Sequence, residues 1–283
     1  MEDSIELAVK RAIATMRDNL GEQITVDDMA RAAMFSKFHF TRIFQRVTGV
    51  SPGRFLSALR LQQAQHLLVS TSLNVADISQ RVGYNSVGTF SSRFSRSVGM
   101  SPTAYRRRAG FASHIPTSAN RNVSPSTAQI HGKVLPHGDG EDRLIFAGLF
   151  PERIPQGQPA QCLVKTGPGP FVLDRVPQGS WHLLAQSVPG NLTDTDGYQA
   201  NVNEAVSVAS FGPVTVRQGT RLHAELHFNP VRVLDPPVLL ALLDVRKLAM
   251  TLVRERSASV ETTSATQQTS HGRPHYTSDR SAA

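Results

Sequence analysis

The feature that most constrains the fold of this sequence is an internal repeat near its N-terminus. Residues 36–55 align with residues 86–105 without a gap, at a constant offset of fifty positions. The matched pairs are Ser36/Ser86, Phe40/Phe90, Phe44/Phe94, Gly49/Gly99, Ser51/Ser101, Pro52/Pro102 and Phe55/Tyr105. Upstream, residues 25–30 resemble residues 74–79. Self-similarity of this kind indicates one supersecondary unit used twice, so we expect two copies of one small fold.

Each copy is predicted to be a short helix, a tight turn and a longer helix. Thr25 and Asn74 are residue types that cap helix N-termini, and each is followed three positions later by an aspartate that faces free N–H groups. Gly49 and Gly99 suit left-handed C-terminal caps. With a leading helix and a joining helix that has proline in its first turn, the prediction is a seven-helix all-α bundle. The predicted ranges are about 4–19, 26–33, 36–48, 52–69 and 75–82, then Ser86 to near Gly99, and a counterpart of the joining helix from Pro102.

The rest of the chain has a different pattern. Residues 111–141 are rich in Ser, Pro, Gly, Asn and His and are predicted to be a flexible linker after a first domain at 1–110. Short apolar runs over 142–235 predict a small antiparallel β-sandwich, with strands near 144–150, 161–165, 171–173, 181–185, 214–216 and 222–228. A helix at 237–256 and a disordered polar tail at 257–283 complete the prediction. The expected fold class is therefore α + β and multidomain.

Charge separates the two parts of the chain. The whole protein carries a formal net charge of +8. Residues 1–112 carry 15 Lys and Arg against 8 Asp and Glu, whereas the remainder carries 15 against 14. A basic first part beside a nearly neutral second part indicates that only the first part contacts a polyanion such as double-stranded DNA.

The helix at 36–48 is predicted to bury one face and present the other to DNA. Its apolar stripe has helical spacing and consists of Phe40, Ile43, Phe44 and Val47. The opposite stripe is Phe38, Thr41, Arg42 and Gln45. Arginine can donate two hydrogen bonds to guanine, glutamine can pair with adenine, and Thr or Phe can meet a thymine methyl group. These four residues are therefore the predicted base-facing residues of the first copy.

The second copy presents smaller side chains at the matching places. Its outward stripe is Gly88, Ser91, Ser92 and Ser95, and short hydroxyls cannot form bidentate contacts with bases. We expect this helix to lie close to the backbone, so that most base specificity resides in the first copy. The residues predicted to contact phosphates are Ser36, Lys37, Ser86, Arg93 and Arg96, with additional charge from the run at 106–108.

The doubled unit, the Ser-Pro turns and the segments 78–84 and 90–94 resemble the DNA-binding domain of AraC/XylS regulators over about 105 residues. The resemblance implies two roughly parallel recognition helices, about 34 Å apart, in successive major grooves. It also implies that Phe38, Thr41 and Arg42 contact bases and that Gly88, Ser91 and Ser92 are their counterparts. Ser92 departs from the arginine common at its position, which puts the second half-site in question. The domain order departs too, because most relatives carry this module last.

A second resemblance concerns the β-rich part. Residues 171–185 are similar to the strand-turn-strand of prealbumin-like, carboxypeptidase-regulatory-type domains. This similarity extends over about 85 residues and rests on a Val-Pro-x-Gly turn that is common between strands. It implies a β-sandwich but assigns no activity to it.

The sequence shows none of the motifs that we associate with catalysis, cofactors or metals. There is no phosphate-binding glycine loop, His-Glu-x-x-His pair or Gly-x-Ser-x-Gly turn. His223 and His227 would stand about 13 Å apart on a strand, too far to share one ion. A single cysteine, Cys162, and the absence of a secretory signal or a long apolar run favour a cytoplasmic protein without a membrane span.

Three functions remain open at this stage. The first is a sequence-specific transcription regulator that recruits or blocks RNA polymerase, with a sensory or oligomerising C-terminal part. That part would bind a small-molecule effector or form a homodimer. The second is a β-sandwich interaction protein that uses weakly specific DNA binding only for location. The third, a regulatory fragment of an enzyme, is disfavoured by the missing catalytic motifs.

Overall fold

The computed structural model describes residues 2–112, 126–136, 143–189, 206–240 and 242–243. Residues 1–243 form one compact unit, and the second unit, 244–283, lies wholly outside the described residues. The predicted tail at 257–283 is therefore not described. Among the helices in the described ranges, none is both long and apolar enough to cross a membrane.

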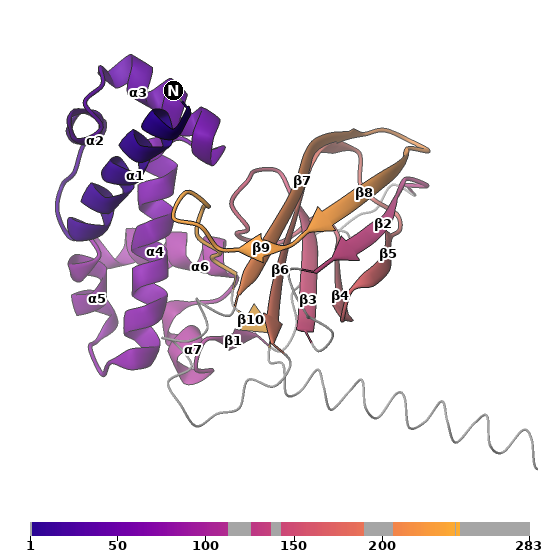
Figure 1. The fold of residues 1–283 in the computed structure, drawn as a ribbon. Helices are drawn as coiled ribbons and strands as arrows, with labels where there is room; N and C mark the ends of the chain where they lie inside the picture. Colours follow the sequence, from indigo (N-terminus) through magenta and orange to yellow (C-terminus); the bar gives the residue numbers. More distant parts are fainter. Residues whose placement is uncertain (1, 113–125, 137–142, 190–205, 241, 244–283) are drawn as a thin grey trace, which may run out of the picture. The chain divides into compact units, whose positions relative to one another are not determined.

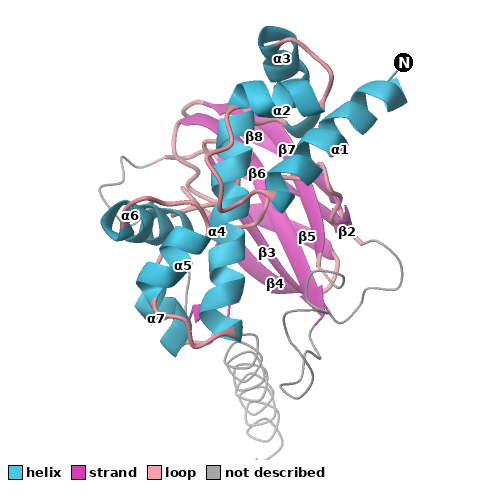
Figure 2. Ribbon diagram, turned by 90° about the vertical axis from the view of Figure 1, so that its left-hand side faces the viewer, coloured by secondary structure: helices cyan, strands magenta, loops and turns pink. Residues whose placement is uncertain are grey.

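The seven predicted helices are present, and their bounds lie within a few residues of those expected. Figure 1 shows the longest of them, α4, joining the first helix-turn-helix unit to the second, and Figure 2 shows the same arrangement from the side. The unit α2–α3 and its repeat α5–α6 flank this joining helix in the sequence. The helices are α1 (Glu2–Asp18), α2 (Val26–Ala32), α3 (Lys37–Thr48), α4 (Pro52–Ser70), α5 (Val75–Arg81), α6 (Val87–Val98) and α7 (Pro102–Arg107).

The repeat in the sequence is also a repeat in the core. In each copy three aromatic rings pack in a row, namely Phe40, Phe44 and Phe55 in the first copy and Phe90, Phe94 and Tyr105 in the second. The last two rings of each row meet edge to face. The ring centroids of Phe44 and Phe55 are 5.4 Å apart at 87°, and those of Phe94 and Tyr105 are 5.5 Å apart at 81°. Edge-to-face aromatic pairs stabilise a core beyond their buried area. The same interlock therefore fixes each longer helix against the helix that follows it.

The β-rich part consists mainly of two sheets with one common core. The five-stranded sheet has the order β4-β3-β6-β7-β9, with all neighbours antiparallel, and the three-stranded sheet has the order β5-β2-β8. Buried residues of both sheets, such as Leu173 and Leu183, belong to one hydrophobic cluster. The strands are β2 (Gln129–Leu135), β3 (Arg143–Phe150), β4 (Cys162–Thr166), β5 (Gly169–Leu173), β6 (Gly179–Pro189), β7 (Ser207–Val216), β8 (Arg221–His227) and β9 (Asn229–Pro230).

Two expectations about these sheets were wrong. The predicted linker at 111–141 contains β2, the central strand of the smaller sheet, and β1 (Phe111–Ala112). In addition, β2 runs parallel to β8, so the smaller sheet is mixed instead of antiparallel. Gly132 of β2 lies so close to β8 that a Cβ there would collide with the carbonyl of Ala224. This glycine breaks the apolar alternation by which strands are recognised.

The helix predicted for 237–256 was also wrong over its first residues. The described residues 237–240 are not helical, and Leu242 and Leu243 form β10 (Leu242–Leu243), which pairs in parallel with β1. Neighbouring apolar side chains of this segment pack against different parts of the molecule, whereas the apolar stripe of one helix packs against a single surface. Leu239 is buried with the helices, whereas Leu240 packs on the five-stranded sheet. The remainder of the predicted helix, 244–256, lies outside the described residues.

Candidate nucleic-acid interface

Helix α3 places the predicted base-facing residues of the first copy opposite a fully buried stripe. Phe40 and Phe44 are 0% exposed, while Phe38 on the other face is 84% exposed. Arg42 and Gln45 are also exposed, and Thr41 is half-buried. Phe38 has the largest exposed fraction among the exposed large hydrophobic side chains of the described residues. This exposure agrees with the prediction that this face of α3 contacts DNA.

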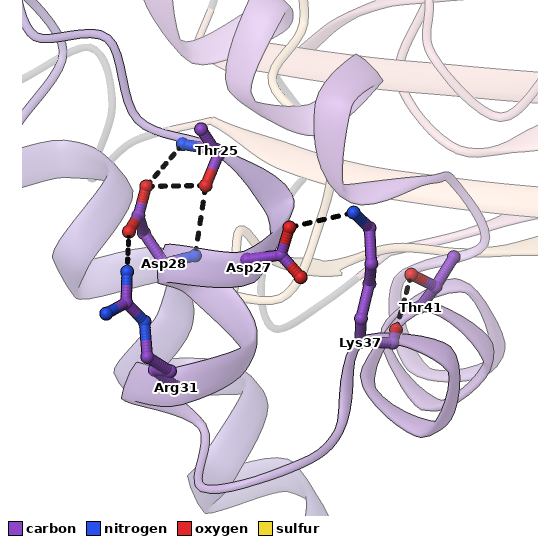
Figure 3. Close-up of polar contacts among 6 residues, drawn as sticks. All are labelled: Thr25, Asp27, Asp28, Arg31, Lys37 and Thr41. Atoms are coloured by element: carbon purple, nitrogen blue, oxygen red, sulfur yellow. Dashed lines mark hydrogen bonds and ion pairs between the residues drawn. The ribbon is translucent and has the colours of Figure 1, made fainter.

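Thr41 uses its hydroxyl group within the helix. Its Oγ1 donates to the carbonyl oxygen of Lys37 at 2.8 Å (Figure 3). The proton of this hydroxyl is thus engaged, while its oxygen lone pairs and the methyl group remain available to a base. Thr41 is suited to an apolar contact with a thymine methyl group rather than to hydrogen-bond donation.

The first helix-turn-helix unit begins with a capping box at the N-terminus of α2. The Thr25 hydroxyl accepts a hydrogen bond from the Asp28 N–H at 3.2 Å, and the Asp28 carboxylate accepts one from the Thr25 N–H at 2.8 Å (Figure 3). Asp28 also pairs with Arg31. The Thr25 hydroxyl also donates to the Asp28 carboxylate at 2.6 Å. This hydrogen bond, then the one from the Thr25 N–H, and then Arg31 lower the pKa of the Asp28 carboxyl. The start of α2 is therefore fixed by residues predicted from the sequence.

Lys37, a predicted phosphate contact, forms an ion pair with Asp27 of α2. Its Nζ lies 2.8 Å from Oδ2 of Asp27, and both side chains are more than half exposed (Figure 3). An exposed ion pair of this kind is weak and exchanges readily. Nearby, the Ser36 side chain forms no cap hydrogen bond at the start of α3. Both residues are thus positioned at the helix N-terminus, where anions bind favourably.

Helix α6 repeats the geometry with smaller residues. Phe90 and Phe94 are 0% exposed, and the opposite stripe presents exposed Gly88 and Ser92 with a half-buried Ser91. A Cβ at Gly88 would meet only the Ser86 hydroxyl, at 3.7 Å. Ser86 accepts a hydrogen bond from the Thr89 N–H at 3.4 Å, so its hydroxyl is partly engaged in capping. The stripe can approach a ligand closely but has no side chain that reaches far.

The basic residues divide into exposed and structural ones. Arg93 and Arg96 are exposed. Arg106 instead donates to backbone carbonyls in the last turn of α4 and just after it, from Nε to Leu68 at 2.9 Å and from Nη2 to Leu73 at 2.5 Å. This arginine of the 106–108 run therefore braces the fold, contrary to the expectation that it serves DNA.

Sequence reasoning missed one candidate. Arg46 is exposed in the last turn of α3 and is the exact repeat counterpart of Arg96, fifty positions away. The offset that aligns the two copies would have paired them. Arg46 therefore joins the predicted phosphate contacts.

The residues considered for metal binding and redox chemistry have other surroundings. Glu225 lies between His223 and His227, with a carboxylate oxygen 3.3 Å from Nε2 of His227. In the described ranges, no group of three or more His, Cys, Asp or Glu is placed to hold a metal ion. Burial raises the pKa of the Cys162 thiol to about 11, which disfavours the reactive thiolate.

Comparisons with known proteins match the helical part. A family model described as a helix-turn-helix domain covers residues 29–108. The transposon Tn10 TetD protein of Escherichia coli is 30% identical over 99 residues, which are 35% of this chain and 72% of that protein. The chain belongs to the AraC family of helix-turn-helix transcription regulators. The residues of this AraC-family member that the family model matches include both α3 and α6.

Other matches cover a similar share of the chain. The lactose operon transcription activator of Staphylococcus xylosus is 31% identical over 37% of each chain. A solved AraC-type regulator from Chromobacterium violaceum is 27% identical, with a TM-score of 0.36, and the match covers 37% of this chain and 93% of that one. The AraC-family chain spans about a third of the length of the first curated relatives. The prealbumin-like resemblance of 171–185 stays a prediction. In the structure β5 and β6 of that segment lie in different sheets.

Proposed function

We propose that this AraC-family protein is a sequence-specific transcription regulator that reads two successive major grooves of double-stranded DNA with α3 and α6. The observation that carries the proposal is the face of α3, where exposed Phe38, Arg42 and Gln45 stand over a buried aromatic stripe. The fifty-residue repeat supplies a second helix of the same construction. Two such helices fit grooves one turn of DNA apart.

The two helices contribute differently to recognition. Arg42 and Gln45 have long side chains with hydrogen-bonding ends, and they read bases in the first groove. Gly88, Ser91 and Ser92 let α6 approach the sugar-phosphate backbone of the second groove. The positioning contacts come from Ser36, Lys37, Ser86, Arg93 and Arg96, with Arg46 added by its repeat position. Specificity therefore resides mainly in the first helix-turn-helix.

The remaining partners follow from a regulator's role. RNA polymerase is the protein partner of a regulator that acts on transcription, and one relative is named a transcription activator. The β-rich part serves as a sensory or oligomerising module, through a small-molecule effector or a second copy of the chain. The division into a helical domain at 1–110 and a β-rich domain belongs to this proposal as well, with the second domain beginning at β2 instead of at residue 142.

Selection of bound DNA from a random pool by the full chain tests the function. The proposal expects an enriched site with a strongly specified half and a weaker half, centred about 10 base pairs apart. Excess random DNA should compete poorly with the selected site in a gel shift. A pool that gives no enriched sequence, or equal competition by random DNA, overturns the proposal and favours DNA binding for location only.

A further inference from the structure

The loop between β3 and β4, residues 151–161, connects the five-stranded sheet with the helices. Its base is held by the sheet, because the Ala160 N–H donates to the carbonyl oxygen of Leu149 at 2.8 Å and the Leu149 N–H donates to that of Gln161 at 2.9 Å. Ile154 of the same loop is 2% exposed and belongs to the hydrophobic core of the helical part. The loop is therefore anchored on both sides.

At the C-terminal end of α3 the loop contributes Arg153. Gly49 ends α3 in the left-handed conformation. The Arg153 side chain occupies the space of a Cβ at position 49, with Nη1 2.8 Å from where that atom would lie. The last carbonyl groups of a helix carry a partial negative charge, so a guanidinium group beside them is favourable. The preceding residue, Glu152, forms an ion pair with Arg54 of α4, which holds this part of the loop close to the helices.

At the C-terminal end of α6 the loop contributes Gly157. Its N–H donates at 2.7 Å to the carbonyl oxygen of Ser97, one of the last four carbonyl groups of the helix, which have no partner within it. Gly157 has a φ of +71°, and a Cβ there would lie 3.1 Å from the carbonyl oxygen of Arg96. Glycine is the residue type that permits both the positive φ and so close an approach. A larger residue at this position would push the loop away from α6.

These two contacts connect matching ends of the repeat. Gly49 and Gly99 are repeat counterparts that end α3 and α6. Arg153 and Gly157 are four residues apart in the loop, a separation that the chain spans with at most about 14 Å. When the two helix ends separate, such a short segment must stretch or release one of its contacts. Besides α4, the loop is therefore a second connection between the two helix-turn-helix units.

We propose that the β3–β4 loop holds the C-terminal ends of α3 and α6 at one separation, through Arg153 and Gly157, and thereby fixes the distance between the two DNA half-sites that the protein accepts. The loop needs no contact with DNA for this, so Arg153 and Gly157 are positioning residues. On DNA with another half-site spacing, the protein has to break a loop contact or lose the contacts of one helix. The holding of the helices stands without DNA, whereas the effect on half-site spacing rests on the proposed function.

The separation of the helices is measured first, on the full chain without DNA. Spin labels are attached at His39→Cys of α3 and Thr89→Cys of α6, which are exposed repeat counterparts, and Cys162→Ser removes the native thiol. Pulsed electron paramagnetic resonance then gives the distribution of distances between the labels. We expect one narrow distribution in this background and a broader one after Arg153→Ala or Gly157→Ala, because each substitution removes or displaces one loop contact.

Each substitution has a matched control in the β-rich part. Arg221→Ala removes the same charge from an exposed position on β8. Gly219 has a φ of +72°, and the nearest non-adjacent atom to a Cβ there is the Thr127 hydroxyl at 4.0 Å, so Gly219→Ala introduces similar backbone strain without a close contact. Both controls should keep the narrow distribution. Thermal unfolding shows whether each variant is folded, and Arg153→Ala tests the inference even if Gly157→Ala does not fold.

Half-site spacing is measured next, by titration of the selected DNA site and of versions with one base pair added or removed between its half-sites. We expect the unlabelled wild type to bind the changed sites at least about tenfold more weakly, since one half-site is then out of register. Arg153→Ala should reduce this ratio about two- to fivefold, which is the range that a cation at a helix C-terminus supplies. A general loss of stability or of charge would instead weaken binding to all spacings alike.

The inference is overturned if Arg153→Ala and Gly157→Ala leave the distance distribution unchanged, or if the two controls broaden it equally. It is also overturned if the variants retain the wild-type ratio between the spacings. Absence of any selected site would count against the proposed function and would leave the distance measurement as it is, so the two failures are distinguishable.

Discussion

At the scale of single residues, the start of the first helix-turn-helix depends on one carboxylate. Asp28 accepts hydrogen bonds from both the backbone and the side chain of Thr25 and pairs with Arg31. These contacts favour the charged carboxylate and lower its pKa relative to an unfolded chain. A group with a depressed folded pKa stabilises the fold above its unfolded pKa, and this stabilisation is lost as the pH falls through the folded pKa.

The first prediction follows from the lowered pKa of Asp28. Asp28→Asn should lower the free energy of unfolding at pH 7, and its difference from the wild type should shrink as the pH falls below about 4, where the unfolded carboxyl protonates. Urea unfolding at several pH values measures it. Glu22→Gln, which removes an exposed carboxylate outside the capping box, is the control and should have no effect at pH 7. A difference for Asp28→Asn that does not change between pH 7 and pH 3 would contradict the account.

At the scale of elements, the helices were predictable and parts of the sheets were not. The caps at Thr25, Asn74 and the two glycines mark helix ends by local chemistry, which the structure retains. Strand β2 was missed because its partner strand β8 is about ninety residues away, and its glycine is required by that distant strand. Similarly, the apolar run after Pro237 resembles a helix until the separate partners of Leu239 and Leu240 are known.

The candidate site divides in the same way. The outward stripes of α3 and α6 were predicted because helical spacing alone separates buried from exposed positions. The predictions for Lys37 and Arg106 were incomplete, because their partners, Asp27 and carbonyl groups at the end of α4, come from other segments.

The second prediction concerns β2. Gly132→Ala should lower the free energy of unfolding by about 1–3 kcal/mol, because the new Cβ meets backbone atoms of Ala224, which cannot move aside as a side chain can. Gly53→Ala, at an exposed site in α4 with open space around it, is the matched control. It should be neutral or stabilising by up to about 1 kcal/mol. Urea unfolding compares the two, and equal effects would argue against the close approach of β2 and β8.

At the scale of the whole molecule, the core of the helices is completed by residues from far along the chain. Ile154, Leu234 and Leu239 belong to the same buried cluster as the aromatic rows of the two repeats. The sequence predicted instead a separate first domain at 1–110. Since a fragment ending at 112 lacks these three side chains, we expect it to be less stable than the full chain.

The third prediction tests this shared core. Leu239→Ala should lower the free energy of unfolding by about 2–5 kcal/mol, because it removes a fully buried side chain. Val231→Ala, at a position that is 45% exposed in the same segment, should change it by less than about 0.5 kcal/mol. Chemical unfolding, monitored through the spectroscopic signal of the helices, measures the free energy of unfolding of each variant. If Leu239→Ala leaves that transition unchanged, the helices do not depend on this segment.

The central claim is that α3 reads bases and α6 mainly positions the protein. The most direct test measures the binding of full-length Arg42→Ala and Ser92→Ala to the selected site and to all its single-base variants. Arg42→Ala should lose about 1–3 kcal/mol of discrimination at one base pair of the first half-site. Ser92→Ala should lose much less at every position, because serine has no long side chain to withdraw. Comparable losses from the two substitutions, or none from Arg42→Ala, would contradict the account.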